Sequence, residues 1–186
     1  MKTYTIIGGV NGAGKSSLSG VLKTQKNLGY IIDVDKITKI KKCSSLEAGK
    51  IAISKIAGYL DRGISFTQET TLSGNKTLDT VRKAKDNGYY IRLFYVGLDT
   101  ASESIKRIEN RVAKGGHNID SDDVMRRFDN RFDSLAKVLP YCDEVSFFDN
   151  DNGFTEVAEY KNGELILKNG HKPNWLCIFE EQLNNL

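Results

Sequence analysis

An eight-residue segment near the N-terminus has residue types and a spacing suited to holding phosphate. Residues 9–16, Gly-Val-Asn-Gly-Ala-Gly-Lys-Ser, match the pattern G-x-x-x-x-G-K-[ST] in full. Glycines allow backbone conformations in which several N–H groups converge on one phosphate, and a helix that begins at the loop adds its dipole. Lys15 is expected to reach the β- and γ-phosphates, and the Ser16 hydroxyl is expected to hold Mg²⁺. The predicted nucleotide-binding residues are Gly9, Asn11, Gly12, Ala13, Gly14, Lys15, Ser16 and Ser17.

The alternative for this segment is a glycine-rich turn between a strand and a helix, with Lys15 solvated. The apolar run 3–8 that precedes it and the helix-compatible run that follows favour the phosphate loop. Such a loop does not by itself separate a kinase from a nucleotide-driven switch or motor.

Two acids follow the next apolar run, in Ile31-Ile32-Asp33-Val34-Asp35. A carboxylate here could accept the proton of an acceptor hydroxyl as the hydroxyl attacks a γ-phosphate, or it could lie near Mg²⁺. The alternative is that an acid caps the following helix through backbone N–H groups. We favour capping for Asp33, and for Asp35 a functional role is favoured largely by the family resemblance described below.

A third acid, Glu69, ends the next apolar run, 64–69. A carboxylate placed after a buried run is costly unless it is paired or used. Glu69 is therefore predicted to contact Mg²⁺ or the acceptor, the alternative being an ion pair with Lys or Arg. Thr70, Thr71 and Ser73 could donate hydrogen bonds to a substrate, or they could cap the helix that follows.

Residues 107–131 carry five arginines on two predicted helices that flank Gly115-Gly116, and we call them the arginine segment. This layout is typical of a lid that closes over phosphates, because guanidinium groups stay charged and offer planar donors to a transferring phosphoryl group. The alternative is two solvated helix faces with i,i+4 ion pairs such as Asp123–Arg127. His117 alone carries little information, and we expect it to stabilise the loop or to be exposed. The arginines are Arg107, Arg111, Arg126, Arg127 and Arg131.

Predicted strands alternate with predicted helices along most of the chain, which indicates β-α-β units and a mostly parallel sheet. Ligands bind beyond the carboxyl ends of strands in such sheets, so the acids and the glycine loop are expected at one edge. The fold prediction is a three-layer P-loop kinase fold with a helical lid and a C-terminal β-hairpin. We expect a single kinase domain over 1–186, with the hairpin and a helix in 154–186. Strands are predicted at 3–8, 30–33, 64–69, 89–96 and 144–148, and helices at 15–24, 46–62, 75–87, 101–113 and 121–139.

Composition sets broad limits on the protein class. The 186 residues suit one domain, and a net charge of +3 gives no argument for nucleic-acid binding. Three widely spaced cysteines, Cys43, Cys142 and Cys177, argue against a metal site or a disulfide framework. No signal peptide and no apolar run of membrane-spanning length is recognisable, so we expect a cytoplasmic protein without a membrane partner.

Several segments together resemble the zeta-toxin family of P-loop kinases, in the short form often labelled a predicted ABC-type ATPase. They occur in the order of that family and cover most of residues 3–150. The two most specific are Glu-Thr-Thr-Leu-Ser-Gly and Arg-Val-Ala-Lys-Gly-Gly-His. The matching segments are 8–17, 31–35, 69–74, 93–98, 111–119 and 124–128.

The resemblance implies transfer of a γ-phosphate to a sugar hydroxyl, best known as the 3′-hydroxyl of UDP-N-acetylglucosamine, and a small antitoxin that blocks the nucleotide site. By motif position, it implies phosphate binding by Lys15, Mg²⁺ binding by Ser16 and a base role for Asp35. Glu69 would contact substrate or metal. Arg111 and one of Arg126 or Arg127 would be the lid arginines.

Three functions follow from these patterns. The first is a kinase that uses ATP or GTP with Mg²⁺ to phosphorylate a small molecule. The second is a non-kinase P-loop NTPase or a nucleotide-sensing module. The third is a kinase of RNA or DNA ends, which the low net charge and the acids among the arginines disfavour.

Overall fold

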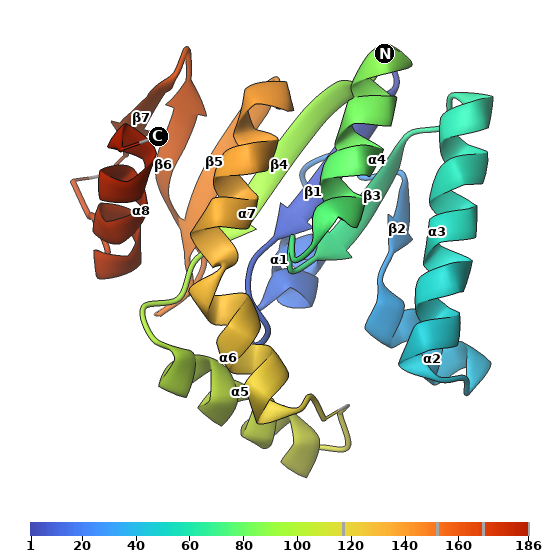
Figure 1. Ribbon diagram of the computed structural model, residues 1–186, viewed down its shortest axis with the longest axis horizontal. Coiled ribbons are helices and arrows are strands. Elements are labelled where there is room, and N and C mark those ends of the chain that lie inside the picture. Colours follow the sequence, from blue (N-terminus) through green and yellow to red (C-terminus); the bar gives the residue numbers. More distant parts are fainter. Residues whose placement is uncertain (117, 152, 169, 186) are drawn as a thin grey trace.

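The computed structural model describes residues 1–116, 118–151, 153–168 and 170–185, and within them the strands form one sheet (Figure 1). The strand order is β2-β3-β1-β4-β5-β6-β7. The pairs among the first five strands are parallel, and β6 and β7 are antiparallel additions. The predicted mostly parallel sheet is therefore confirmed. The strands are β1 (Thr3–Gly8), β2 (Tyr30–Ile32), β3 (Phe66–Thr70), β4 (Tyr90–Val96), β5 (Glu144–Asp149), β6 (Thr155–Lys161) and β7 (Glu164–Leu167).

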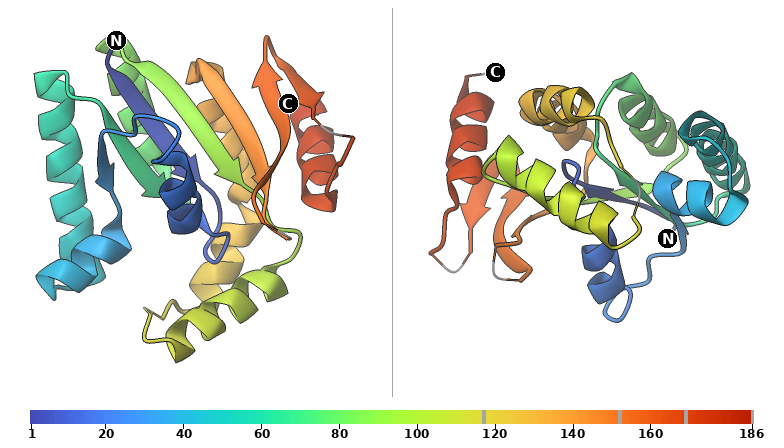
Figure 2. Two further views of the ribbon diagram at one scale, coloured as in Figure 1. Left: turned by 180° about the vertical axis from the view of Figure 1, so that it is seen from behind. Right: turned by 90° about the horizontal axis from the view of Figure 1, so that it is seen from below.

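Helices lie on both faces of the sheet and beyond one of its edges. Figure 1 shows α3, α4, α7 and α8 on the near face, and Figure 2 shows α1 on the far face. The pair α5 and α6 lies beyond the carboxyl ends of the parallel strands. This arrangement confirms the three-layer prediction. The helices are α1 (Lys15–Leu22), α2 (Val34–Lys41), α3 (Ser45–Arg62), α4 (Asn75–Asp86), α5 (Ala101–Ala113), α6 (Ser121–Asp129), α7 (Arg131–Val138) and α8 (Asn174–Asn184).

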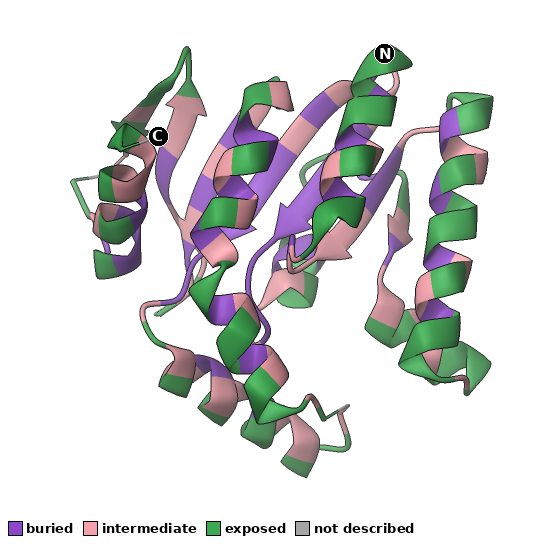
Figure 3. Ribbon diagram, in the orientation of Figure 1, coloured by how far each residue is buried: buried purple, intermediate pink, exposed green. Residues whose placement is uncertain are grey.

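Side chains along the central strands point alternately to the two faces of the sheet, so each face has its own hydrophobic core. In β1, Tyr4 and Ile6 pack in the core beneath α3, α4 and α7, whereas Ile7 packs in the core beneath α1. Both sets of side chains are fully buried, and Figure 3 shows that burial is concentrated in the sheet. A strand buried on both faces is typical of a parallel sheet, and it holds the glycine loop that follows β1 in a fixed position.

The predicted helix over 121–139 is wrong in one respect, because the chain forms α6, then α7, then a short 3-10 turn (Leu139–Tyr141). The break falls at Asn130, whose side-chain amide donates to the carbonyl of Arg126 and competes with helical pairing. Phe132 and Leu135 on α7 pack in the same core as Tyr4 and Ile6. Phe128 on α6 packs instead in the core on the other face, which contains Ile7 and lies beneath α1. Two helices with different partners replace one straight helix.

The C-terminal hairpin is present as predicted. β6 and β7 pair from Ala158–Leu167 to Lys161–Glu164. Asn162 and Gly163 between them both have positive φ, 54° and 88°, as the tight hairpin turns require.

Trp175 on α8 fixes the C-terminal helix to the sheet. Its ring is fully buried against Tyr95 and Phe147, its Nε1 donates to Asp149 at 2.9 Å, and its backbone N–H donates to Asp99 at 2.7 Å. Gly97 makes room for the ring, because a Cβ at that position would lie 2.1 Å from a ring carbon. The start of α8 is thereby tied to the ends of β4 and β5.

Replacing Trp175 by alanine is expected to lower the free energy of unfolding by about 3–5 kcal/mol, because a large cavity forms and the Asp149 carboxylate loses its donor. Ile178 on the same helix is 40% exposed and serves as the control. Urea unfolding of both variants measures the effect. A similar loss for Ile178→Ala would show that α8 itself, rather than the anchored ring, sets the stability.

Within the described residues, none of the helices combines the length and the apolar character needed to cross a membrane.

Candidate nucleotide and acceptor site

The glycine loop joins β1 to α1 and has the backbone geometry of a phosphate-binding loop. Gly9 has φ of +145°, and a Cβ there would lie 2.5 Å from the carbonyl oxygen of Val96 on β4. Only glycine fits this close approach. Lys15 begins α1, and its Nζ donates to the carbonyls of Gly9 and Val10, both at 2.9 Å. The ammonium thus lies over the loop, where phosphates would bind.

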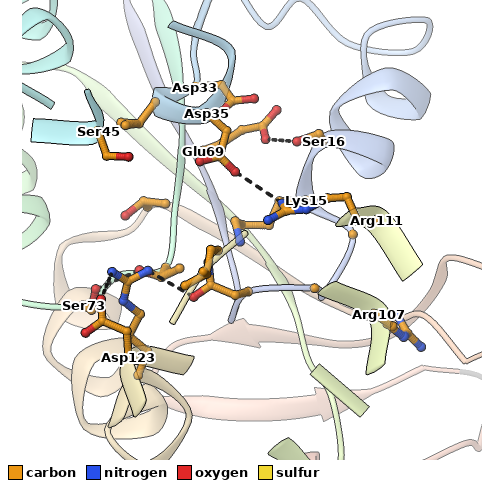
Figure 4. A pocket seen from close by; sticks show the side chains of 18 of the residues that line it. Lys15, Ser16, Asp33, Asp35, Ser45, Glu69, Ser73, Arg107, Arg111 and Asp123 are labelled. Carbon is orange, nitrogen blue, oxygen red and sulfur yellow. Dashed lines mark hydrogen bonds and ion pairs between the residues drawn. The ribbon is translucent and has the colours of Figure 1, made fainter. Parts of the chain in front are cut away.

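One cavity of about 620 Å³ opens at the carboxyl ends of β1, β2 and β3, and Figure 4 shows the side chains that surround it. Each predicted segment contributes to its lining. The predicted residues that line it are Asn11, Gly12, Gly14, Lys15, Ser16, Ser17, Asp35, Glu69, Thr70, Thr71, Arg111 and Arg127. Gly9 and Ala13 are buried behind the loop, and Arg126 does not line this cavity.

Glu69 is held against the start of α1. Its two carboxylate oxygens accept hydrogen bonds from Ser16 Oγ at 2.5 Å and from Ser19 Oγ at 2.6 Å. The parallel pairing of β3 with β1, which sets Glu69 opposite Ile7, produces this contact. Burial raises the pKa of Glu69 above its usual value, and the two hydroxyls oppose that shift. The expected alternative, an ion pair with Lys or Arg, is not found among the described residues.

Ser16 and Glu69 offer hard oxygen donors, which Mg²⁺ prefers, and a P-loop magnesium ion takes most of its remaining ligands from phosphates and water. Ser19 was not predicted from the sequence. It follows Ser16 by three residues and therefore shares a helix face with it, a spacing that could have identified it.

The two acids after β2 have different roles in the structure. Asp33 is the N-cap of α2, and its Oδ1 accepts from the backbone N–H groups of Asp35 and Lys36, as predicted. The Asp35 side chain makes no capping bond and is 49% exposed. Its Oδ2 lies 3.3 Å from Nη1 of Arg111 on α5. Asp35 is therefore available to a ligand in the cavity.

The hydroxyl groups at and just after the end of β3 bond within their own segment, except that Thr70 Oγ1 also lies 3.3 Å from Thr77 Oγ1 on α4. Thr70 Oγ1 accepts from the N–H of Leu72, and Thr71 Oγ1 and Ser73 Oγ are 2.8 Å apart. The N-cap of α4 is Gly74, which has no side-chain cap, so the expected alternative of a capping serine or threonine is not found there. All three hydroxyl residues line the cavity.

The arginine segment places its members differently. Arg127 lies above the glycine loop, with Nη1 donating to Asn11 Oδ1 and Nη2 donating to Asp123 Oδ2, both at 3.2 Å. Its Nε is buried and has no hydrogen-bond partner among the described residues. Arg126 is 63% exposed and pairs with Asp123 at 2.5 Å. Arg127 is thus the better placed of the two predicted candidates.

The other arginines are engaged outside the centre of the cavity. Arg107 donates to Glu103 and to the carbonyl of Asn150 at the rim. Arg131 stacks on Phe128 and Phe132, with its guanidinium carbon 3.7 Å and 4.1 Å from the ring centres, and so has a packing role. His117 lies outside the described residues.

Lys15 is half-buried, and its ammonium lies deep in the cavity. Burial lowers the pKa of Lys15 to about 8, although Glu69, Asp35 and Asp33 act in the opposite direction. A bound phosphate would raise this pKa again, because it brings negative charge close to the ammonium.

Nucleotide affinity is therefore expected to fall as the pH rises above about 8. Below that pH Lys15 is charged before binding, whereas above it binding must take up a proton, which weakens affinity by up to about tenfold per pH unit. Titration calorimetry with ATP between pH 7 and 9.5, in buffers of different ionisation enthalpy, measures both the affinity and the proton uptake. Lys15→Arg remains charged throughout and should show neither effect. An equal pH dependence in this variant would assign the titration to another group.

Comparison with known proteins gives one sequence relative and several structural ones. No family model matches the chain. An uncharacterized protein of Haemophilus influenzae is 34% identical over 125 residues, which are 64% of this chain and 88% of that protein.

Two solved structures share the fold. A chain of the AvrRxo1-ORF1:-ORF2 complex with ATP has a TM-score of 0.67 at 17% identity, over 98% of this chain. This chain spans 63% of its length. A chain of the PezAT chromosomal toxin-antitoxin system of Streptococcus pneumoniae has a TM-score of 0.64 at 20% identity, over all of this chain and 87% of its own. At these identities the likeness establishes the fold.

Proposed function

We propose that the chain transfers a nucleotide γ-phosphate to a hydroxyl of a small molecule. It belongs to one family with the Haemophilus influenzae protein, and it has the fold of the zeta-toxin-like P-loop kinases. The observation that supports this most directly is the 620 Å³ cavity. It gathers Lys15 for the phosphates, Asp35 for an acceptor hydroxyl and Arg127 for the transferring group.

In the proposed reaction, the oxygen of the acceptor hydroxyl attacks the γ-phosphorus as the bond from that phosphorus to the bridging oxygen breaks. The nucleoside diphosphate leaves with the electron pair of that bond. Asp35 accepts the hydroxyl proton and later gives it to solvent. Arg127 and Lys15 stabilise the charge on the phosphoryl oxygens through fixed donors.

Magnesium would be held by the Ser16 hydroxyl, with Glu69 orienting that hydroxyl. When bound, the ion neutralises charge on the β- and γ-phosphates. The hydrogen bond from Ser16 to Glu69 holds the Ser16 hydroxyl in place at the end of the glycine loop. The bond from Ser19 to Glu69 fixes the position of the carboxylate in turn.

The nucleotide, the acceptor and the protein partner are proposed from similarity to known proteins. ATP is the proposed nucleotide, since the AvrRxo1 complex was solved with it, and GTP is the alternative. A UDP-sugar such as UDP-N-acetylglucosamine is the first acceptor to test. A small antitoxin protein is the proposed partner, because PezAT is a toxin-antitoxin system.

The test is incubation of the purified protein with Mg²⁺-ATP and a panel of UDP-sugars and free sugars, followed by mass spectrometry. A mass gain of one phosphate on an acceptor is expected, together with one ADP per product. Steady ATP hydrolysis that no acceptor accelerates would instead support the non-kinase NTPase. A steep salt dependence of oligonucleotide binding, with phosphorylation of their ends, would support a nucleic-acid kinase.

A further inference from the structure

Two side chains outside the cavity hold backbone carbonyls of the glycine loop on its outer side. Ser104 on α5 donates from Oγ to the carbonyl of Asn11 at 2.5 Å. Asn150, which follows β5, donates from Nδ2 to the carbonyl of Ala13 at 3.0 Å. Ser104 is fully buried, Asn150 is half-buried, and neither lines the 620 Å³ cavity. Their hydrogen bonds therefore act on the loop itself rather than on a ligand in the cavity.

Each of these two bonds also sets the direction of a backbone N–H group. In a trans peptide, the carbonyl of one residue and the N–H of the next point in opposite directions, and the described residues contain no cis peptide bond. Because the carbonyls of Asn11 and Ala13 are held on the outer side, the N–H groups of Gly12 and Gly14 are turned the other way. Both glycines line the cavity. Backbone N–H groups that converge in this manner form a site for an anion such as phosphate.

The contact between α5 and the loop is close enough to account for the glycine at position 12. Gly12 has φ of +76°, and a Cβ there would lie 2.8 Å from the carbonyl oxygen of Ser104. The phosphate-loop pattern leaves this position open to any residue. The glycine is therefore explained by the packing of α5 against the loop.

Arg107 joins the two supporting residues to each other. It follows Ser104 by three residues on α5, and its Nη2 donates to the backbone carbonyl of Asn150 at 2.9 Å. The residue before Asn150, Asp149, is itself fixed, because it is buried and accepts from Trp175 Nε1 at 2.9 Å. The glycine loop is thus held from outside by two elements that are also tied to each other.

We infer that Ser104 and Asn150 are positioning residues for nucleotide binding, which keep the N–H groups of Gly12 and Gly14 directed at the phosphates of the nucleotide. The inference rests on the proposed nucleotide site and is independent of the acceptor. Without either support, the peptide unit can rotate and turn a carbonyl oxygen toward the phosphate. An attractive donor is then replaced by a repulsive acceptor.

The test measures the affinity of the whole protein for Mg²⁺ and a non-hydrolysable ATP analogue by calorimetry, in Ser104→Ala and in Asn150→Ala, with urea unfolding of each variant. Thr67→Val is the matched control, because the buried Thr67 hydroxyl also donates to a backbone carbonyl, that of Leu28, at 2.5 Å. Thr67 lies on β3 and does not line the cavity. Asn150 is only half-buried, so Asn150→Ala carries the test if Ser104→Ala does not fold.

Affinity for the analogue is expected to weaken about tenfold in each of the two variants, the loss of roughly one hydrogen bond to a charged group, and to stay within about twofold of wild type in Thr67→Val. At saturating nucleotide, the phosphorus NMR signals of the α- and β-phosphates should move in Ser104→Ala and Asn150→Ala only. Lost stability alone would not move them. Unchanged affinity in a folded variant of either residue, or an equal loss in Thr67→Val, would overturn the inference. Failure of the wild type to bind the analogue would instead count against the proposed function, and the inference would fall with it.

Discussion

Asp35→Asn is expected to lower the rate of phosphoryl transfer by roughly 10²–10⁴-fold while ATP affinity stays within about threefold of wild type. The amide keeps the size of the side chain but cannot accept the hydroxyl proton. Asp35 makes no capping bond on α2, so the helix should be unaffected. Its ion pair with Arg111 joins two half-exposed groups, and such pairs add little to stability. Transfer rates at saturating ATP and acceptor, with ATP affinity from calorimetry, separate chemistry from binding.

Asp33→Asn is the matched control for this prediction. Asparagine caps helices as well as aspartate does, so the variant should keep both the fold and nearly all of the activity. If Asp33→Asn is the inactive variant and Asp35→Asn transfers phosphate normally, the proton acceptor has been assigned to the wrong carboxylate. Equal losses in both would indicate that negative charge at this edge, rather than one base, is what matters.

The sequence predicted those parts of the site whose chemistry is local. The glycine loop needs only its own eight residues and the strand before it, and both lie where they were expected. Asp33 and Asp35 after β2 and Glu69 near the end of β3 could be assigned to one edge because parallel strands share the direction of their carboxyl ends. The capping role of Asp33 was also predictable, since it depends only on the N–H groups of the next few residues.

Features that depend on packing between distant segments were not predictable in the same way. The break between α6 and α7 at Asn130 accompanies a change of packing partner, because Phe128 of α6 and Phe132 of α7 belong to the cores on opposite faces of the sheet. The contact between Asp35 on α2 and Arg111 on α5 joins residues 76 positions apart in the chain. The bonds from Ser19 to Glu69 and from Arg127 to Asn11 depend in the same way on tertiary contacts.

The sequence could not decide whether Arg126 or Arg127 faces the glycine loop. Neighbouring residues on a helix point about 100° apart, so only the orientation of α6 decides which of the two does. Arg127 reaches Asn11 at 3.2 Å, whereas Arg126 is 63% exposed. Arg127→Ala is therefore expected to lower kcat by about 10³-fold, because the transition state loses a fixed charged donor.

Arg126→Ala should leave kcat within about threefold of wild type, because its ion-pair partner among the described residues is Asp123 and exposed pairs contribute little. Single-turnover rates of the two variants at saturating nucleotide are the measurement. Arg127→Lys should recover only part of the lost rate, since an ammonium keeps the charge but not the planar pair of donors that reaches both Asn11 and Asp123. If Arg126→Ala is the damaging change, α6 must rotate when nucleotide binds, and the arginine segment then works as a moving lid rather than as a preset one.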